Sequence, residues 1–462
     1  MHVFRSAALL AGIVAAGCQS YSADPVDLAA HAAAFAQRIP DGAALREFVE
    51  RLRSRDPTLQ PFDLADGLDL REAHNVALLF HPELRTLRLR ADVARVGAEH
   101  AGRWDDPTLS ADFSKILETV DHPWLVGGAI GLTLPITGRP GLVKELAESR
   151  HAQALVEARV AEARILRELD FAWAKWSTAR LAANVLEDLV GRLTELETIA
   201  TRLASTQLIT SVEARTFTLE RTTREVQLVR ARASVAAGEL GLKQLLGLPP
   251  DGPVAFVPAT VIPMHVADPA QRRAGLTDSP RTAIAHRAHD VADRQFALAI
   301  RKQWPELLLL PGFQEEDAQP RAALGFSLPL PLWNANAREV AETRAERARA
   351  AEALRGSLET ALQDLALAEV RHKAAVSQRH LVDTQLMPLA EQQLTDGRRL
   401  VELGRLDTLL ILDALTRSYD AKTTAIDTAL AEAEATIEIN SLFWPTLTRD
   451  NPTGGNPTEA SR

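Results

Sequence analysis

Two long helical patterns meet at the stretch Gly404-Arg405-Leu406-Asp407-Thr408-Leu409-Leu410-Ile411-Leu412-Asp413-Ala414. A helical hairpin must reverse direction here, and Gly404 suits the reversal because glycine accepts the positive φ that other residues resist. The leucines that follow begin an apolar helix, which Asp407 and Asp413 interrupt. The pattern therefore predicts the tip of a long helical hairpin.

The chain contains an earlier counterpart of this tip, because Thr206-Gln207-Leu208 corresponds to Gly404-Arg405-Leu406. The same separation in sequence relates Pro82 to Pro280, each at the start of a helical pattern. A unit made of a helix, two short strands, a long helix, a turn and a second long helix has therefore been duplicated. Duplicated units are typical of pseudo-symmetric assemblies and uncommon in enzymes.

Each unit contains two short stretches with a period of two residues. In the first unit apolar side chains alternate over 109–113 and 126–134, while in the second the alternation is clear over 322–328 and poor over 307–313. The offset between the units predicts a shorter second strand pair. With their flanks, these runs approach the roughly ten residues of a tilted transmembrane β-strand. A soluble hairpin with one buried face has the same period, so both interpretations remain open.

A membrane interpretation requires several copies of the chain. Four strands cannot close a barrel, and strands in a membrane need closure to satisfy every backbone hydrogen-bonding group. Three chains of four strands each would give a twelve-stranded barrel.

The helical patterns are unusually long. No proline occurs from Leu142 to Ser205, a stretch of roughly 100 Å at about 1.5 Å per residue. Such a helix must pack in an extended coiled-coil array. In the second unit, Met387-Pro388 is expected to bend the corresponding helix, because proline removes a backbone hydrogen bond. The predicted fold class is mainly α with a small β part.

The N-terminus has the features of a bacterial export signal. Arg5 precedes the apolar stretch 7–16, which is too short to span a bilayer. Small residues before Cys18 resemble a lipoprotein signal, in which this cysteine is lipidated, and Gln19 favours the outer membrane. The alternative is a plain secretory signal with an incidental cysteine. The expected boundaries are 1–17 for the signal peptide, 18–66 for a peripheral segment, 67–255 and 256–446 for the two units, and 447–462 for a disordered tail.

Composition and motifs argue against several classes of function. The 462 residues carry a net charge of −9 and no basic block that would suit nucleic acid. The sequence has one cysteine and lacks a phosphate-binding loop and a His-Glu-x-x-His motif. His286 and His289 are three residues apart, but a solvated helix face is a better interpretation than a metal site. We expect no catalytic residue, no cofactor and no metal site.

Several short motifs occur in an order that resembles one known family. They are Leu70-Arg71-Glu72-Ala73 through His81-Pro82-Glu83-Leu84, Leu245-Leu246-Gly247-Leu248-Pro249, Pro388-Leu389-Ala390-Glu391, Gly404 through Ala414, and Tyr419. From Leu68 to about Thr446 the chain resembles the TolC-type outer-membrane efflux protein family. Trp104-Asp105-Asp106-Pro107 and Thr137-Gly138-Arg139 are most similar to the branch that exports cations and heavy metals.

The resemblance implies a TolC-like α/β-barrel, built as a homotrimer with a twelve-stranded β-barrel in the outer membrane and an α-helical barrel in the periplasm. It also implies outer-membrane lipid, a periplasmic adaptor (membrane fusion) protein and an inner-membrane pump of the RND type as partners. The expected function is the outer-membrane channel of a tripartite efflux pump that carries cations, heavy metals or drugs. The alternative is a structural periplasmic coiled-coil lipoprotein without an open channel.

The resemblance also assigns roles to residues at the hairpin tips. Both tips, Thr206-Gln207-Leu208 and Gly404-Arg405-Leu406, are expected to contact the adaptor, although Thr206 stands where the first tip usually has glycine. Asp413 would face the lumen at the periplasmic constriction, with Leu410 where some members carry a second acidic residue. The alternative is that Asp413 is an ordinary solvated aspartate or forms a salt bridge with Arg405 or Arg417.

Overall fold

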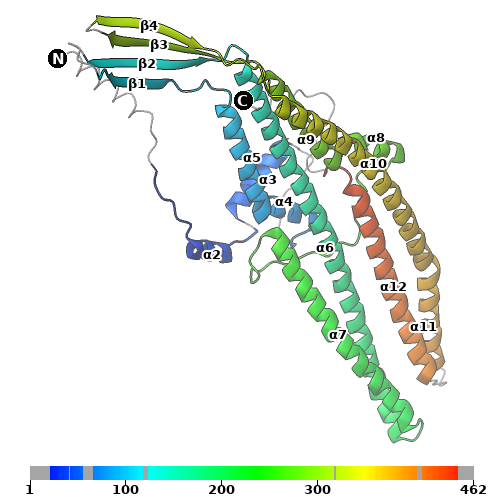
Figure 1. The fold of residues 1–462 in the computed structure, drawn as a ribbon. Helices are drawn as coiled ribbons and strands as arrows, with labels where there is room; N and C mark the ends of the chain where they lie inside the picture. The colour runs from blue at the N-terminus through cyan, green and yellow to red at the C-terminus, as the bar shows by residue number, and fades with distance from the viewer. Residues whose placement is uncertain are drawn as a thin grey trace.

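The computed structural model describes residues 21–40, 42–55, 66–117, 123–316, 319–402 and 408–445. Over these residues, a small antiparallel sheet lies at one end of the molecule and long helices extend away from it (Figure 1). The prediction of a mainly α fold with a small β part is confirmed. Cys18, Gly404, Arg405 and Leu406 lie outside the described residues, so the predictions for them remain predictions.

The sheet unites the strand pairs of both units. Its order is β1-β2-β3-β4 with every neighbour antiparallel, and β2 joins β3 through pairs such as Leu132 with Leu309. The strands are β1 Thr108–Lys115, β2 Trp124–Leu134, β3 Leu307–Glu316 and β4 Gln319–Ser327. The expected shortening of the second strand pair is wrong. The offset lies in the connections, because residues 116–123 join β1 to β2 whereas 317–318 join β3 to β4.

Two long helical hairpins extend away from the sheet (Figure 1). The first pairs α6 with α7, and α6 alone spans 67 residues, as its uninterrupted pattern predicts. The second pairs α12 with α10 and α11. The bounds are α6 Arg139–Ser205, α7 Ser211–Leu246, α10 Ala337–Leu381, α11 Met387–Glu402 and α12 Thr408–Asn440. A π-helical turn, η2 Val382–Leu386, separates α10 from α11. This turn lies directly before Met387-Pro388. Pro388 has no N–H to donate to a carbonyl four residues earlier, so the regular α-helical hydrogen bonding is interrupted at this point.

The shorter helices α5 Pro82–His100 and α9 Pro280–Arg301 extend the hairpins toward the sheet. The end of α7 meets the start of α5 so closely that a Cβ at Gly247 would lie 2.5 Å from the carbonyl oxygen of Phe80; Gly247 also has φ +66°. The end of α12 meets the start of α9, where Trp444 Nε1 donates to the carbonyl of Asp278 at 2.7 Å. The helices therefore form four columns in the order α5/α7, α6, α9/α12 and α10/α11 (Figure 1).

Short elements wrap the columns near their middle. They are α3 Ala43–Arg55, α4 Leu70–Phe80, α8 Pro269–Gly275 and the 3-10 turn η1 Leu276–Asp278, whereas α2 Leu28–Ala36 has no buried residue and lies apart from the columns (Figure 1). The largest core cluster lies here, where Trp173, Trp176 and Phe256 meet edge to face with ring centroids 5.4–5.8 Å apart. Leu45 and Val49 of α3 are buried in the same cluster, so α3 packs against this core.

Candidate functional site

The first hairpin tip is a tight turn between α6 and α7. Thr206 has an ordinary φ of −94°, whereas Gln207 takes a left-handed φ of 60°. Leu208 donates its backbone N–H to the carbonyl of Leu203 at 3.0 Å, which closes the turn in the manner of a helix C-cap. The position that favours glycine is therefore Gln207 and not Thr206, where the resemblance expects it. Leu208 points its apolar side chain outward, 72% exposed.

The start of α7 is fixed by a reciprocal cap. The Glu213 backbone N–H donates to Thr210 Oγ1 at 3.2 Å, and the Thr210 N–H donates to the Glu213 carboxylate at 2.7 Å. Two N–H groups that the helix cannot satisfy internally are thereby paired. The cap fixes the residue at which α7 begins after the turn.

Asp413 lies near the start of α12 in a local ion pair. Arg417 Nε donates to its Oδ2 at 2.7 Å, and Gln393 Nε2 of α11 lies 3.4 Å from the same oxygen. The hydrogen bond to Asp413 raises the pKa of Arg417. The Asp413 side chain is half exposed, and Leu410 one turn earlier is 37% exposed. The structure thus realises the Arg417 pairing, and the lumen-facing role of Asp413 and Leu410 remains a prediction.

The two hairpins contact each other just beyond Asp413. The Arg224 guanidinium of α7 lies over the Tyr419 ring of α12, 5.2 Å from its centroid. Leu415 of α12 is buried against Leu189 and Leu228 of the first hairpin. This junction is not predictable from the sequence, since nothing in a local pattern relates residues so far apart in the chain. The junction holds the first turns of α12 next to the first hairpin.

Helix α7 has a second apolar seam that its own chain leaves exposed. One seam faces α6 and is buried through Ala214, Leu228, Val235 and Leu242. The second seam consists of apolar residues spaced by seven residues or a multiple of seven, and each of them is 51–71% exposed. It comprises Val212, Leu219, Val226 and Leu240. The seam was not among the features predicted from the sequence, although its heptad spacing is visible there.

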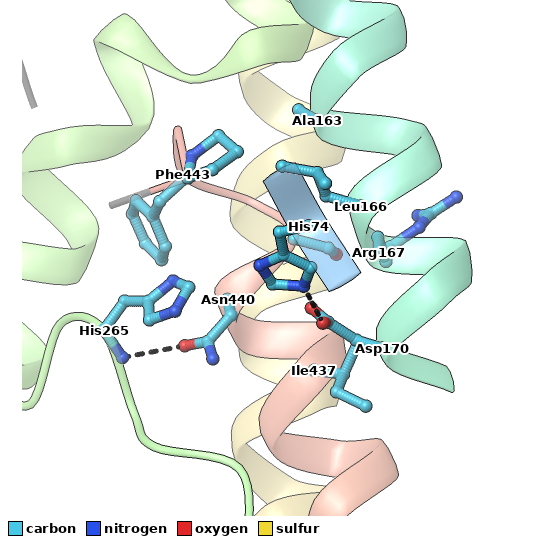
Figure 2. A pocket seen from close by; sticks show the side chains of 11 residues that line it. His74, Ala163, Leu166, Arg167, Asp170, His265, Ile437, Asn440 and Phe443 are labelled. Carbon is cyan, nitrogen blue, oxygen red and sulfur yellow. Dashed lines mark hydrogen bonds and ion pairs between the residues drawn. The ribbon is translucent and has the colours of Figure 1, made fainter. Parts of the chain in front are cut away.

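Figure 2 shows a small pocket where the wrapping elements meet α6 and α12. His74 Nε2 of α4 lies 2.6 Å from Asp170 Oδ1 of α6, and the His265 backbone N–H donates to Asn440 Oδ1 at 2.9 Å. The pocket holds about 50 Å³, well below the roughly 300–1,000 Å³ of small-molecule sites. These contacts fasten the wrapping elements to the columns.

The described part of the chain has neither a cluster suited to a metal ion nor a helix suited to crossing a membrane. It contains no group of three or more His, Cys, Asp and Glu side chains that would suit a metal ion, and His286 Nδ1 lies 3.3 Å from Asp290 instead. None of its helices has the length and apolar character needed to cross a membrane.

The fold is similar to that of solved outer-membrane channels. The outer membrane protein VceC from Vibrio cholerae has a TM-score of 0.68 at 18% identity, covering 81% of this chain and 97% of VceC. The outer-membrane channel OprN has a TM-score of 0.68 at 16% identity, covering 92% and 97%. The open state of the MtrE channel from Neisseria gonorrhoeae has a TM-score of 0.65 at 16% identity, covering 83% and 91%. No protein-family model matches the sequence, and no curated protein matches it. At these identities the similarity establishes the fold.

Proposed function

We propose that the chain is one subunit of a trimeric outer-membrane channel that serves as the exit duct of a tripartite efflux pump. The single observation that carries the proposal is that both the sheet and the layer of helical columns end in two edges that have no further neighbour among the described residues. On one side lie β1, α5 and α7, and on the other β4, α10 and α11 (Figure 1).

The edges of the sheet require partners if the strands cross a membrane. Within the described residues, β1 and β4 each pair on one side only. Unpaired backbone groups in hydrocarbon cost several kcal/mol each. Joining β1 of one copy to β4 of the next satisfies them, and three copies complete a twelve-stranded barrel.

The helical layer supports the same assembly. An isolated hairpin needs one apolar seam on each helix, whereas α7 has two. A helix with seams on both sides is suited to the wall of a helical barrel, where it has neighbours on both sides. The exposed seam is therefore a surface for the α10/α11 edge of the next copy.

Location and partners complete the proposal. Cys18 would carry the lipid that adds to anchoring in the outer membrane, and the hairpin tips would meet the helical hairpins of a periplasmic adaptor. An inner-membrane pump of the RND type would supply the cargo. Cations and heavy metals are the favoured cargo because of the motifs at Trp104 and Thr137, and drugs are the alternative.

Cysteine cross-linking between the sheet edges tests the assembly. Cysteines placed on β1 at Ala111 and on β4 at Ala323 or its neighbours should yield a three-chain species in intact outer membranes. A matched control is Leu132→Cys with Leu309→Cys, because these residues face each other within one chain and should link without changing the mass. Failure of every β1–β4 pair to link chains, with the control linked, would rule out the barrel. A linked trimer without conductance in planar bilayers would instead indicate a closed structural rod.

A further inference from the structure

A second and larger cleft lies where the α9/α12 column changes from one helix to the other. It is lined by α6, α9, α10 and α12 and has a volume of about 440 Å³. Helices that meet end to end leave a gap beside their neighbours that a continuous helix would fill. The volume falls within the range of small-molecule sites.

The lining combines an apolar floor with arginines. The apolar part includes Ile284, Leu367 and Leu442. Four arginines and two carboxylates also line the cleft. They are Arg164, Arg167, Arg281, Arg371, Asp364 and Glu438. Arg164 is paired with Glu83 at 2.6 Å and with Glu168 at 2.7 Å, neither of which lines the cleft, so Arg164 adds no uncompensated charge.

Several of these arginines retain free hydrogen-bond donors. Arg167 has no hydrogen bond or ion pair to any residue that the structure describes. Arg281 contacts Asp364 at 2.8 Å and Arg371 contacts Glu438 at 3.1 Å, each through Nη1. A guanidinium has five N–H donors, so both keep donors for another acceptor.

The start of α9 adds a weaker contribution of the same sign. Pro280 is its first residue, and its first turn contains no acidic residue. The N-terminus of a helix carries a partial positive charge that favours anions. This charge reinforces the arginines at the same end of the cleft.

We propose that the cleft binds an organic anion, with a phosphate or carboxylate group on an apolar body. Arg167 holds the anionic group through charge-assisted hydrogen bonds, with the spare donors of Arg281 and Arg371. Ile284, Leu367 and Leu442 contact the apolar body. The proposal is independent of the channel function, since binding is measured on the isolated assembled protein.

Calorimetry with 1-naphthyl phosphate tests the site. The detergent-solubilised full-length protein should bind this probe saturably, 1-naphthoate similarly, and both neutral 1-naphthol and inorganic phosphate at least tenfold more weakly. Arg167→Gln should weaken binding of the phosphate probe about tenfold or more, because hydrogen bonds to charged groups are lost. Leu367→Glu should also weaken it, by placing a carboxylate in the apolar floor.

Arg150→Gln is the matched control, because Arg150 is another exposed α6 arginine without a hydrogen bond or ion pair to the described residues. It should leave binding unchanged. The proposal is overturned if the wild type shows no saturable binding, if Arg167→Gln binds like the wild type, or if Arg150→Gln causes the same loss. Thermal melting of each variant verifies that the fold is retained.

Discussion

Replacing Asp413 with asparagine is expected to shift the ion preference of the channel toward anions. The Asp413 carboxylate and the Arg417 guanidinium form a pair without net charge. Removal of the carboxylate uncovers Arg417, and the proposed trimer then carries three uncompensated positive charges around one axis. Rings of charge at a constriction set the sign of the preferred ion.

The size of the effect follows from Coulomb's law. In water, a unit charge about 10 Å from a permeating ion changes its energy by about 0.4 kcal/mol. Three such charges change the local ion concentration about eightfold when screening is weak, and about twofold at roughly 0.1 M salt. The experiment therefore belongs at low ionic strength, where the Debye length exceeds the pore radius.

Reversal potentials in planar bilayers under a salt gradient measure the change. Arg417→Gln uncovers Asp413 and should shift the potential in the opposite direction, toward cation preference. The double variant restores neutrality and should behave like the wild type. Identical potentials in all four proteins would show that this pair does not line the conduction path, even if each variant forms a normal trimer.

Four further outcomes test other parts of the structure. Gln207→Gly should stabilise the protein by about 0.5–1 kcal/mol in denaturant unfolding, because glycine accepts the φ of 60° without strain; a loss of stability would refute the turn assignment. Leu219→Asp should lower trimer yield at least tenfold in native mass spectrometry, since burying a leucine contributes about 1.5–3 kcal/mol, whereas Gln227→Asp beside the seam should not. Cys18→Ser should remove the lipid from the mature N-terminus, seen by intact mass, and leave the trimer. Leu406→Asp should abolish efflux and adaptor cross-linking but retain the trimer; unchanged cross-linking would contradict tip docking.

Local periodicity made much of the fold predictable from the sequence. The duplicated pattern predicted the strand pairs and long helical hairpins, and Met387-Pro388 marked the break after α10. Such features depend on residues a few positions apart. The pairing of β2 with β3 was not predictable, since no local signal states which strand edges meet. The same holds for the core of Trp173, Trp176 and Phe256, which brings distant segments together.

The same distinction between local and long-range contacts applies to the candidate site. The Asp413–Arg417 pair was among the open alternatives because its partners are four residues apart on one helix. The contact of Arg224 with Tyr419 escaped prediction because it joins the two hairpins. At the first tip, family resemblance pointed to Thr206, yet the backbone places the left-handed residue at Gln207, because the position of a C-cap depends on where the last helical hydrogen bond forms.

The sheet and the helices agree on how a closed assembly must be built. Each layer has four members per chain, and the order of the strands runs in the same direction as that of the columns. A rotation that brings β1 of one copy beside β4 of the next therefore also brings α5 and α7 beside α10 and α11. In the proposed trimer, one threefold axis would pair the strand edges in the membrane and would also bury the outer seam of α7 below it. Two independent needs, backbone pairing in lipid and burial of apolar seams in water, would then be met by the same three copies.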